Sequence, residues 1–238
     1  MPTRRPDPGA RLIDNRLLAA LPPEEYDRIA PHCTIVHLKS SAPIYDMNAR
    51  IEQVYFPLSG MISVVALMAD GNMVEAGTIG REGMTGLPIF YGDDHSPLLT
   101  FAQVPGDHAR LPIAVFREAL VPGTTLYRLT QLFAQSYFVL TAQSAGCNRL
   151  HPNEERCARW LLLTQDRVGA ATFSLSHEFL GMMLGTRRAS VTLAMSTLQR
   201  AGLITYRRGV VTITDHPGLE AATCECYGII TARYARAD

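Results

Sequence analysis

The chain has 238 residues, 47% of them hydrophobic and 18% charged, which fits one large or two modest folded domains and excludes a disordered protein. Its 22 basic residues balance its 22 acidic ones, which excludes a protein that attracts nucleic acid through overall positive charge. Any nucleic-acid binding must therefore come from charges gathered locally.

The N-terminal sequence and the cysteines indicate a reduced, cytoplasmic setting. The first ten residues, MPTRRPDPGA, are polar and rich in proline and lack the apolar segment of a secretory signal. The cysteines are odd in number and scattered: Cys33, Cys147, Cys157, Cys224 and Cys226. Residues 129–148 carry no charge, but their glutamines, serines and asparagine do not suit a membrane span. We therefore expect no contact with a membrane.

The N-terminal half predicts short helices followed by an antiparallel β-roll. Residues 12–30 favour short helices broken at Pro22–Pro23. Short β-rich segments then follow, separated by Gly, Pro and Asp, at residues 34–38, 53–56, 61–68, 73–79 and 98–104. Asp70–Gly71 is a strong signal for a two-residue hairpin turn. Several short strands at this spacing are typical of an antiparallel roll or barrel.

After Pro122–Gly123 the sequence predicts one long helix, from about residue 124 to 149. Two core positions of a heptad repeat are occupied by Leu126, Phe133, Leu140 and Cys147, and by Leu129, Ser136, Gln143 and Leu150. The helix could pair with a second copy of itself or lie on its own β-roll. We favour self-pairing, because so long an uncharged face exceeds what one small roll can cover.

The C-terminal third predicts a helix-turn-helix. An amphipathic helix with Trp160 in its core comes first, and Ser176 is suited to cap a second helix from His177 to Leu184. Gly181 is small where another helix must cross, and Gly185 suits a tight turn of positive φ. We expect Thr186 to cap a further helix to about Arg200. Its inward residues are expected to be Val191, Ala194, Met195 and Leu198.

Local charge indicates that this segment binds DNA. No acidic residue lies between Glu178 and Asp215, while five arginines do, at positions 187, 188, 200, 207 and 208. The sequence LITYRRGVVTIT predicts a hairpin wing with Arg207 and Arg208 at its tip. Arginine can bind guanine O6 and N7 together, and short hydroxyl side chains can reach bases or phosphates. Candidate DNA-binding residues are His177, Thr186, Arg187, Arg188, Ser190, Thr192, Arg207 and Arg208.

Four segments together resemble the Crp/Fnr superfamily of bacterial transcription regulators. They are YFPLSGMISVV (55–65), GREGMTGLPIFYG (80–92), CNRLHPNEERCARWLL (147–162) and LGTRRASVTLAMSTLQRAGLI (184–204). The resemblance implies an α+β fold: an N-terminal antiparallel β-roll that senses an effector (residues 1–122), a dimerisation helix (123–150) and a C-terminal winged helix-turn-helix (151–238). It further implies a homodimer on two-fold symmetric double-stranded DNA, with half-sites ~34 Å apart, and contact with RNA polymerase.

Departures from the family pattern bear on the ligand and on the DNA site. In the loop that resembles the cyclic-AMP pocket, Gly86 stands at the glutamate position and Asp93 and Asp94 would repel a phosphate, so cyclic-nucleotide binding in the usual mode is not expected. In the second helix Ala189 replaces the usual glutamate, which leaves Arg188 as the principal base reader. The candidate effector residues are Arg81, Glu82, Gly83, Thr85, Gly86, His95, Ser96, Ser136 and Gln143.

The main alternative is a small-molecule-binding or metal-dependent β-roll enzyme of the cupin type. No HxH or HxxxH pair and no G-x-S-x-G motif occurs, so we expect neither a metal centre nor a catalytic residue, and no enzyme. Only Cys33 precedes residue 147, which argues against an iron–sulfur cluster; any other cofactor is left open. Cys224 and Cys226 would point apart on a helix and have no second Cys or His pair of suitable spacing, so we expect core or surface cysteines.

Overall fold

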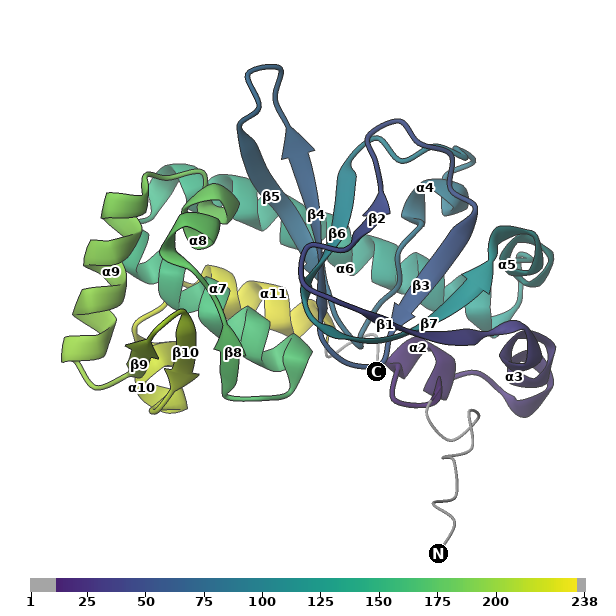
Figure 1. Cartoon of the computed structure of the whole chain (residues 1–238). Coiled ribbons are helices and arrows are strands. Elements are labelled where there is room, and N and C mark those ends of the chain that lie inside the picture. Colours follow the sequence, from purple (N-terminus) through teal and green to yellow (C-terminus); the bar gives the residue numbers. More distant parts are fainter. Residues whose placement is uncertain (1–11, 235–238) are drawn as a thin grey trace, which may run out of the picture. The chain divides into compact units, whose positions relative to one another are not determined.

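The computed structural model describes residues 12–234, so the expectation for the sequence MPTRRPDPGA lies outside the described residues. The chain divides into two compact units. Unit 1 contains the residues up to Ile62 together with Ile79–Gln135, and unit 2 contains Ser63–Thr78 together with the chain from Ser136 onward. Within residues 12–234, no helix is long and apolar enough to cross a membrane. The predicted α+β class, with antiparallel sheets before a long helix and a helix-turn-helix, is confirmed (Figure 1).

The first sheet is built from strands that are far apart in sequence. Strands β1 (Thr34–Leu38) and β3 (Gln53–Pro57) both pair antiparallel with β7 (Gly106–Pro112), which lies between them. The sequence did not predict β7, because the polar stretch Gly106–Asp107–His108 hides its alternation. The helices of this unit are short: α2 (Arg16–Ala19), α3 (Pro23–Ile29), the 3₁₀ helix η1 (Ala30–His32), α4 (Leu87–Phe90) and α5 (Ile113–Ala119).

The second sheet has the strand order β2-β6-β4-β5. Its strands are β2 (Pro43–Tyr45), β4 (Met61–Leu67), β5 (Met73–Ile79) and β6 (Leu99–Val104). The β4–β5 hairpin was expected to have a two-residue turn, and this is wrong. Met68 N donates to Asn72 O (2.8 Å), which leaves a three-residue loop in which Gly71 takes a φ of 85°. Glycine at the end of such a loop supplies the left-handed conformation that lets the strands meet.

The long helix α6 (Thr125–Leu150) has the predicted extent. The face that was expected to pair with a second copy is not the face that the chain leaves exposed. Leu126, Phe133, Leu140 and Cys147, the expected self-pairing residues, are at most 2% exposed within the single chain. One reason is visible at Gly83, where any side chain would overlap the ring of Phe133. Of the other expected core position, Leu129 and Ser136 are buried too, whereas Leu150 is 77% exposed. Most of the seam expected from the sequence is therefore unavailable for self-pairing, because it is buried within the chain itself.

The rest of unit 2 is helical, with one small sheet. Trp160 in α7 is 4% exposed, as expected. The elements are α7 (Asn153–Val168), β8 (Thr172–Ser174), α8 (His177–Leu184), α9 (Arg188–Arg200), β9 (Ile204–Arg207), β10 (Val210–Ile213), α10 (His216–Ala221) and α11 (Cys226–Tyr234). Strand β10 pairs with β9 on one side and with β8, which the sequence did not predict, on the other.

Strand β7 contains a buried histidine whose ionisation should control stability in acid. His108 is fully buried, and within residues 12–234 neither ring nitrogen has a hydrogen-bond partner. Burial lowers the pKa of His108 to about 4, with Asp107 acting in the opposite direction and His37 in the same direction. The folded protein therefore binds this proton less readily than the unfolded chain, whose histidine has a pKa of 6.5.

We predict that His108→Leu makes stability less dependent on pH. As pH falls from 6.5 to about 4, the unfolded wild-type chain takes up a proton at His108 that the folded chain refuses, so the free energy of unfolding falls. Urea unfolding at several pH values should show the variant losing about 1.4 kcal/mol less per pH unit over this window. The variant His32→Leu, at an exposed histidine, serves as the control; equal slopes for His108→Leu and wild type would contradict the prediction.

Candidate nucleic-acid interface

Helices α8 and α9 form the predicted helix-turn-helix. Ser176 accepts a hydrogen bond from Phe179 N (3.0 Å) and so caps α8, and Gly185 ends this helix with a φ of 59°; both expectations are confirmed. The inward side of α9 is buried as expected, through Val191, Ala194, Met195 and Leu198. Apolar spacing and turn residues thus placed this motif correctly from sequence alone.

The expected cap of α9 is wrong. Thr186 was predicted to cap the helix, but the N-cap residue is Arg187, whose side chain forms no capping hydrogen bond. Thr186 N instead donates to Gly181 O (2.9 Å), so Thr186 belongs to the closing turn of α8. The first turn of α9 consequently has no side-chain cap, and such a helix end attracts anions.

The two helices approach each other closely at Gly181. A Cβ atom at this position would lie 3.0 Å from Thr186 O and 3.4 Å from Arg188 N. Gly181 is buried, and hydrogen at the α-carbon leaves room for the backbone of the following turn. The absence of a side chain at Gly181 therefore sets where α9 begins relative to α8.

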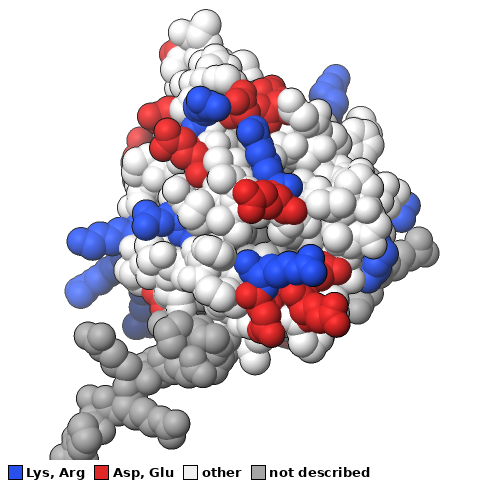
Figure 2. Space-filling view, turned by 90° about the vertical axis from the view of Figure 1, so that its right-hand side faces the viewer, with Lys and Arg blue, Asp and Glu red and all other residues white. Residues whose placement is uncertain are grey.

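Four arginine side chains lie exposed on this motif and its wing: Arg187, Arg188, Arg207 and Arg208. Among the described residues, none of the four guanidinium groups has a hydrogen bond or an ion pair. On the face seen in Figure 2, by contrast, Lys and Arg lie interspersed with Asp and Glu. Residues 179–214 contain no acidic side chain to compensate these charges. The motif can thus present uncompensated cations to a polyanion.

The predicted wing is the hairpin of β9 and β10. Arg207 pairs with Val210, so the turn consists of Arg208 and Gly209, with φ values of 49° and 79°. Positive φ at both central positions defines a type I′ turn, whose twist matches that of the strands. Arg208 stands at the tip of the hairpin and Arg207 at the end of β9.

Two of the candidate DNA-binding residues have partners inside the motif. The hydroxyl of Thr192 donates to Arg188 O (3.0 Å) and lies 3.0 Å from His177 Nδ1. The His177 ring stacks on Tyr206 of β9, with centroids 4.3 Å apart. Burial lowers the pKa of His177, and the nearby Arg188 lowers it further. His177 and Thr192 thus connect α8, α9 and the wing, which limits their freedom to contact bases.

The strand hairpin β4–β5 lies beside the start of α9. Within unit 2, Arg187, Arg188 and Ser190 line a groove of about 910 Å³ whose opposite side includes Met68 and Asn72. At the base of the hairpin, Glu75 accepts hydrogen bonds from Trp160 Nε1 (3.0 Å) and Ser63 Oγ (2.8 Å). Burial raises the pKa of Glu75, although the hydrogen bonds from Ser63 and Trp160 act to lower it. The hairpin is therefore bonded to α7.

Most of the candidate effector residues have contacts with other groups of their own unit. Thr85 Oγ1 lies 2.7 Å from Tyr45 Oη and accepts Tyr55 N, and Ser96 Oγ donates to Leu98 O (2.7 Å). A side chain at Gly86 would meet Val54. In unit 1, Glu82 accepts a hydrogen bond from Gly80 N, and His95 lies 2.8 Å from the carboxylate of Asp94. In unit 2, Ser136 Oγ donates to Arg233 O, and Gln143 Nε2 donates to Cys226 Sγ. Arg81 and Gly83 remain candidates without a ligand-shaped surrounding. Their roles stay predictions.

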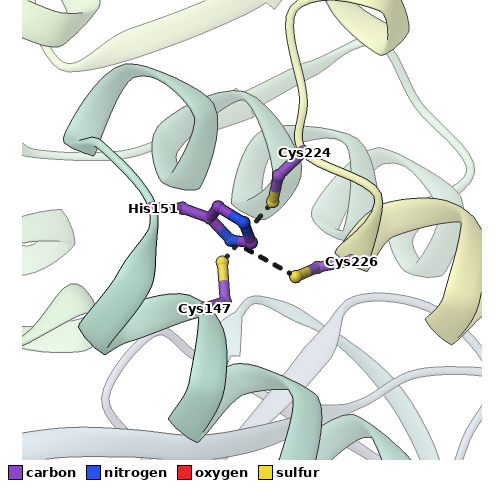
Figure 3. A group of neighbouring side chains, drawn as sticks. All are labelled: Cys147, His151, Cys224 and Cys226. Atoms are coloured by element: carbon purple, nitrogen blue, oxygen red, sulfur yellow. Dashed lines mark hydrogen bonds between the residues drawn. The ribbon is translucent and has the colours of Figure 1, made fainter.

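The structure brings together four side chains that the sequence did not connect. Cys147 and His151, four residues apart at the end of α6, meet Cys224 and Cys226 (Figure 3). Cys224 and Cys226 were expected on one helix, pointing apart, and this is wrong because α11 begins only at Cys226. The signal in the sequence is the spacing Cys147-x₃-His151, which places a thiol and an imidazole on one face of a helix.

Comparison with known proteins agrees with this geometry. Residues 155–222 match the family model of the Crp-like helix-turn-helix domain. A Crp/Fnr-family regulator from Eubacterium rectale is similar in structure, with 19% identity, a TM-score of 0.66, and 87% of this chain and 96% of that one covered. FixK2 from Bradyrhizobium japonicum is similar as well, with 17% identity, a TM-score of 0.69, and 81% of this chain and 98% of that one covered. A CRP-family transcriptional regulator from Thermus thermophilus has 20% identity and a TM-score of 0.64, with 81% of this chain and 96% of that one covered. A comparison with curated protein sequences gave no match.

We predict that Gly181→Ala destabilises the helix pair relative to a matched change. Gly228→Ala in α11 places a methyl group in open space and should raise the free energy of unfolding by about 1 kcal/mol through helix propensity. Gly181→Ala has the same propensity gain but forces its methyl group against Thr186 O, so the two variants should differ by about 1–2 kcal/mol in urea unfolding. Equal stabilisation by both substitutions would contradict the close crossing.

Proposed function

We propose that this chain, which carries a Crp-like helix-turn-helix domain and has the fold of the Crp/Fnr transcription regulators, binds specific double-stranded DNA as a homodimer and controls transcription. The observation that carries the proposal is the set of four exposed, uncompensated arginines on α9 and its wing. Because the protein as a whole carries no net charge, these arginines give it a positive surface only at the helix-turn-helix. Such a surface is suited to the phosphate backbone of DNA.

Each part of the motif has a distinct role in this proposal. Arg188, in the first turn of α9, enters the major groove and binds guanine O6 and N7. The uncapped N–H groups of that turn, with Arg187 and Thr186 beside them, bind a phosphate. Arg207 and Arg208 at the wing contact the DNA backbone, and Ser190, which lines the same groove as Arg188, is within reach of a base or a phosphate. His177 and Thr192 hold the reading helix against the wing.

Dimerisation uses the face of α6 that the chain itself leaves open. Exposed positions on this helix recur in alternating steps of three and four: Arg128, Gln131, Gln135, Phe138, Ala142, Ala145 and Arg149. This is the period of a two-stranded coiled coil. Phe138, at the centre, is 69% exposed, and the small side chains of Ala142 and Ala145 would let two helices approach. The self-pairing inferred from the sequence is thus retained, through a different face.

The signal passes from the β-roll to α9 through the β4–β5 hairpin. Glu75 supports this path, because it accepts one hydrogen bond from Ser63 within the hairpin and another from Trp160 of α7. The tip of the hairpin shares the groove of Arg187 and Arg188, so displacing it would change access to the DNA-reading turn. A cyclic nucleotide bound in the usual mode is not the expected effector, since Gly86 stands at the glutamate position and Asp93 and Asp94 would repel a phosphate. RNA polymerase is the expected partner on DNA.

We predict that Arg188→Ala relaxes base preference at one position of each half-site. The lost bidentate contact should cost ~1–3 kcal/mol on the preferred DNA and little on the substituted one. Arg187→Ala and Arg208→Ala should instead weaken all sequences alike and lower the salt slope by about 1, since they remove phosphate contacts. Electrophoretic mobility shift with selected genomic fragments at several salt concentrations measures both effects.

The control for these variants is Arg50→Ala, which removes an exposed arginine paired with Asp94 outside the motif. It should leave affinity and salt dependence unchanged. If Arg188→Ala behaves like Arg50→Ala, the docking geometry is wrong; if the wild-type chain retards no DNA fragment, the alternative of a β-roll enzyme takes precedence.

We predict that Phe138→Arg disrupts the dimer. A charge placed at the centre of the α6 seam would be buried without a partner, which should raise the dimer dissociation constant by about tenfold or more. Tyr91→Arg, at an aromatic residue of similar exposure (67% against 69%) outside α6, should not change it. Sedimentation equilibrium measures the constant. A Phe138→Arg protein as dimeric as the wild type would exclude this seam.

A further inference from the structure

Three cysteines and one histidine from distant parts of unit 2 converge at the end of α6. Cys147 lies one helical turn before His151, and His151 N still donates to Cys147 O (3.1 Å), so both side chains project from the same face. Cys224 and Cys226 come from the start of α11, more than seventy residues later. The four side chains point toward one another (Figure 3). One ligand atom from each lies within 4.8 Å of all the others.

The distances match a tetrahedral metal centre better than a disulfide. Zinc binds sulfur at about 2.3 Å and imidazole nitrogen at about 2.0–2.1 Å, so tetrahedral angles place two sulfurs about 3.8 Å apart and sulfur and nitrogen about 3.6 Å apart. The Sγ atoms of Cys147 and Cys224 are 3.6 Å apart, and Cys226 Sγ lies 3.5 Å from His151 Nδ1. A disulfide requires about 2.05 Å.

The surroundings of the four side chains are those of a ligand set. His151 Nε2 lies 3.4 Å from the carboxylate of Glu225, which favours the proton on Nε2 and leaves the lone pair of Nδ1 directed at the sulfurs. Gln143 Nε2 donates to Cys226 Sγ (3.2 Å), a bond that a thiolate accepts well. The three cysteines are at most 7% exposed, so a metal held here would be shielded from water.

Charge around the cluster suits an anionic metal centre. Three thiolates, a neutral imidazole and a divalent cation sum to one negative charge. The guanidinium of Arg159 donates to Ser144 Oγ (3.3 Å), and Ser144 lies three residues before Cys147 on the same side of α6, so a cation lies near the cluster. Arg159 is itself buried in α7.

We propose that Cys147, His151, Cys224 and Cys226 form a structural Zn²⁺ site that fastens the start of α11 to the end of α6. Four protein ligands leave no open position, so the site serves folding rather than catalysis. Thiolate-rich sets select zinc over harder cations such as Mg²⁺ and Ca²⁺. The site depends only on residues of unit 2 and stands whether or not the proposed DNA binding holds.

The test begins with wild-type full-length protein, purified under reducing conditions without chelator. Elemental analysis should find about one zinc ion per chain. Replacing it with Co²⁺ should give the visible bands of tetrahedral cobalt and the near-ultraviolet bands of thiolate-to-cobalt charge transfer. Neither measurement uses DNA, so failure here is distinct from failure of the proposed function.

Variants then identify the ligands. Cys226→Ser and His151→Gln should each weaken zinc binding, and Cys226→Ser should also lower the thiolate-to-cobalt charge-transfer intensity, whereas Cys33→Ser and Cys157→Ser, outside the cluster, should change neither. Glu225→Gln leaves the ligands intact but should weaken zinc affinity about 10- to 100-fold in a competition with a chromophoric chelator. Its control is Glu220→Gln, which alters a comparable carboxylate beside His216 (3.9 Å) and should not change the affinity.

Three outcomes would overturn the proposal. One is a fully reduced wild-type protein that binds neither Zn²⁺ nor Co²⁺ in stoichiometric amount. Another is a Cys147–Cys224 disulfide in the natively purified protein, detected by mass spectrometry, which would make the pair a redox element. The third is stoichiometric iron or copper in place of zinc. The cobalt spectrum is recorded on the wild-type protein. The presence of the metal site is therefore decided even if a variant fails to fold.

Discussion

The close crossing of α8 and α9 at Gly181 is the constraint on which the DNA-binding geometry depends. The backbone of Thr186 and Arg188 occupies the space that a side chain at Gly181 would fill. Gly185 then reverses the chain in a left-handed conformation, and α9 begins at once, with Arg187 and Arg188 projecting outward. The stack of His177 on Tyr206 fixes the wing to the same helices. These contacts fix the helices and the wing that carry the four exposed arginines.

Helix α6 shows how one helix can serve two surfaces. Its large apolar residues, such as Phe133 and Leu140, are buried within the chain. The opposite face is uncharged from Gln131 to Ala145 and carries Phe138 among small and polar side chains. Such a face suits close contact between two helices but contributes little to the core of one chain. At the end of this helix, Cys147 and His151 lie close to Cys224 and Cys226. Helix α6 therefore also contacts the start of α11.

Buried polar groups connect the elements of unit 2. Glu75 joins the β4–β5 hairpin to Trp160, and the arginines of α7 extend into the same interior: Arg156 donates to Asn148 and to Leu184 O, and Arg167 lies over the ring of Tyr234. Such groups are costly to bury without partners, so movement of one element changes the hydrogen bonds of the next. Within unit 2, these groups therefore couple the β4–β5 hairpin to α7 and to the C-terminal helix α11.

The sequence by itself determined the local elements: the β-rich first half, the long helix, the bounds of α8 and the buried side of α9, because periodicity, caps and positive-φ glycines act over a few residues. Only the tertiary structure decided what depends on distant neighbours. It showed which face of α6 is buried, that Arg187 rather than Thr186 is the N-cap residue of α9, and that Cys224 and Cys226 meet Cys147 and His151. Contacts over more than seventy residues leave no period in a sequence, and packing partners, not propensity, choose between two plausible faces of one helix.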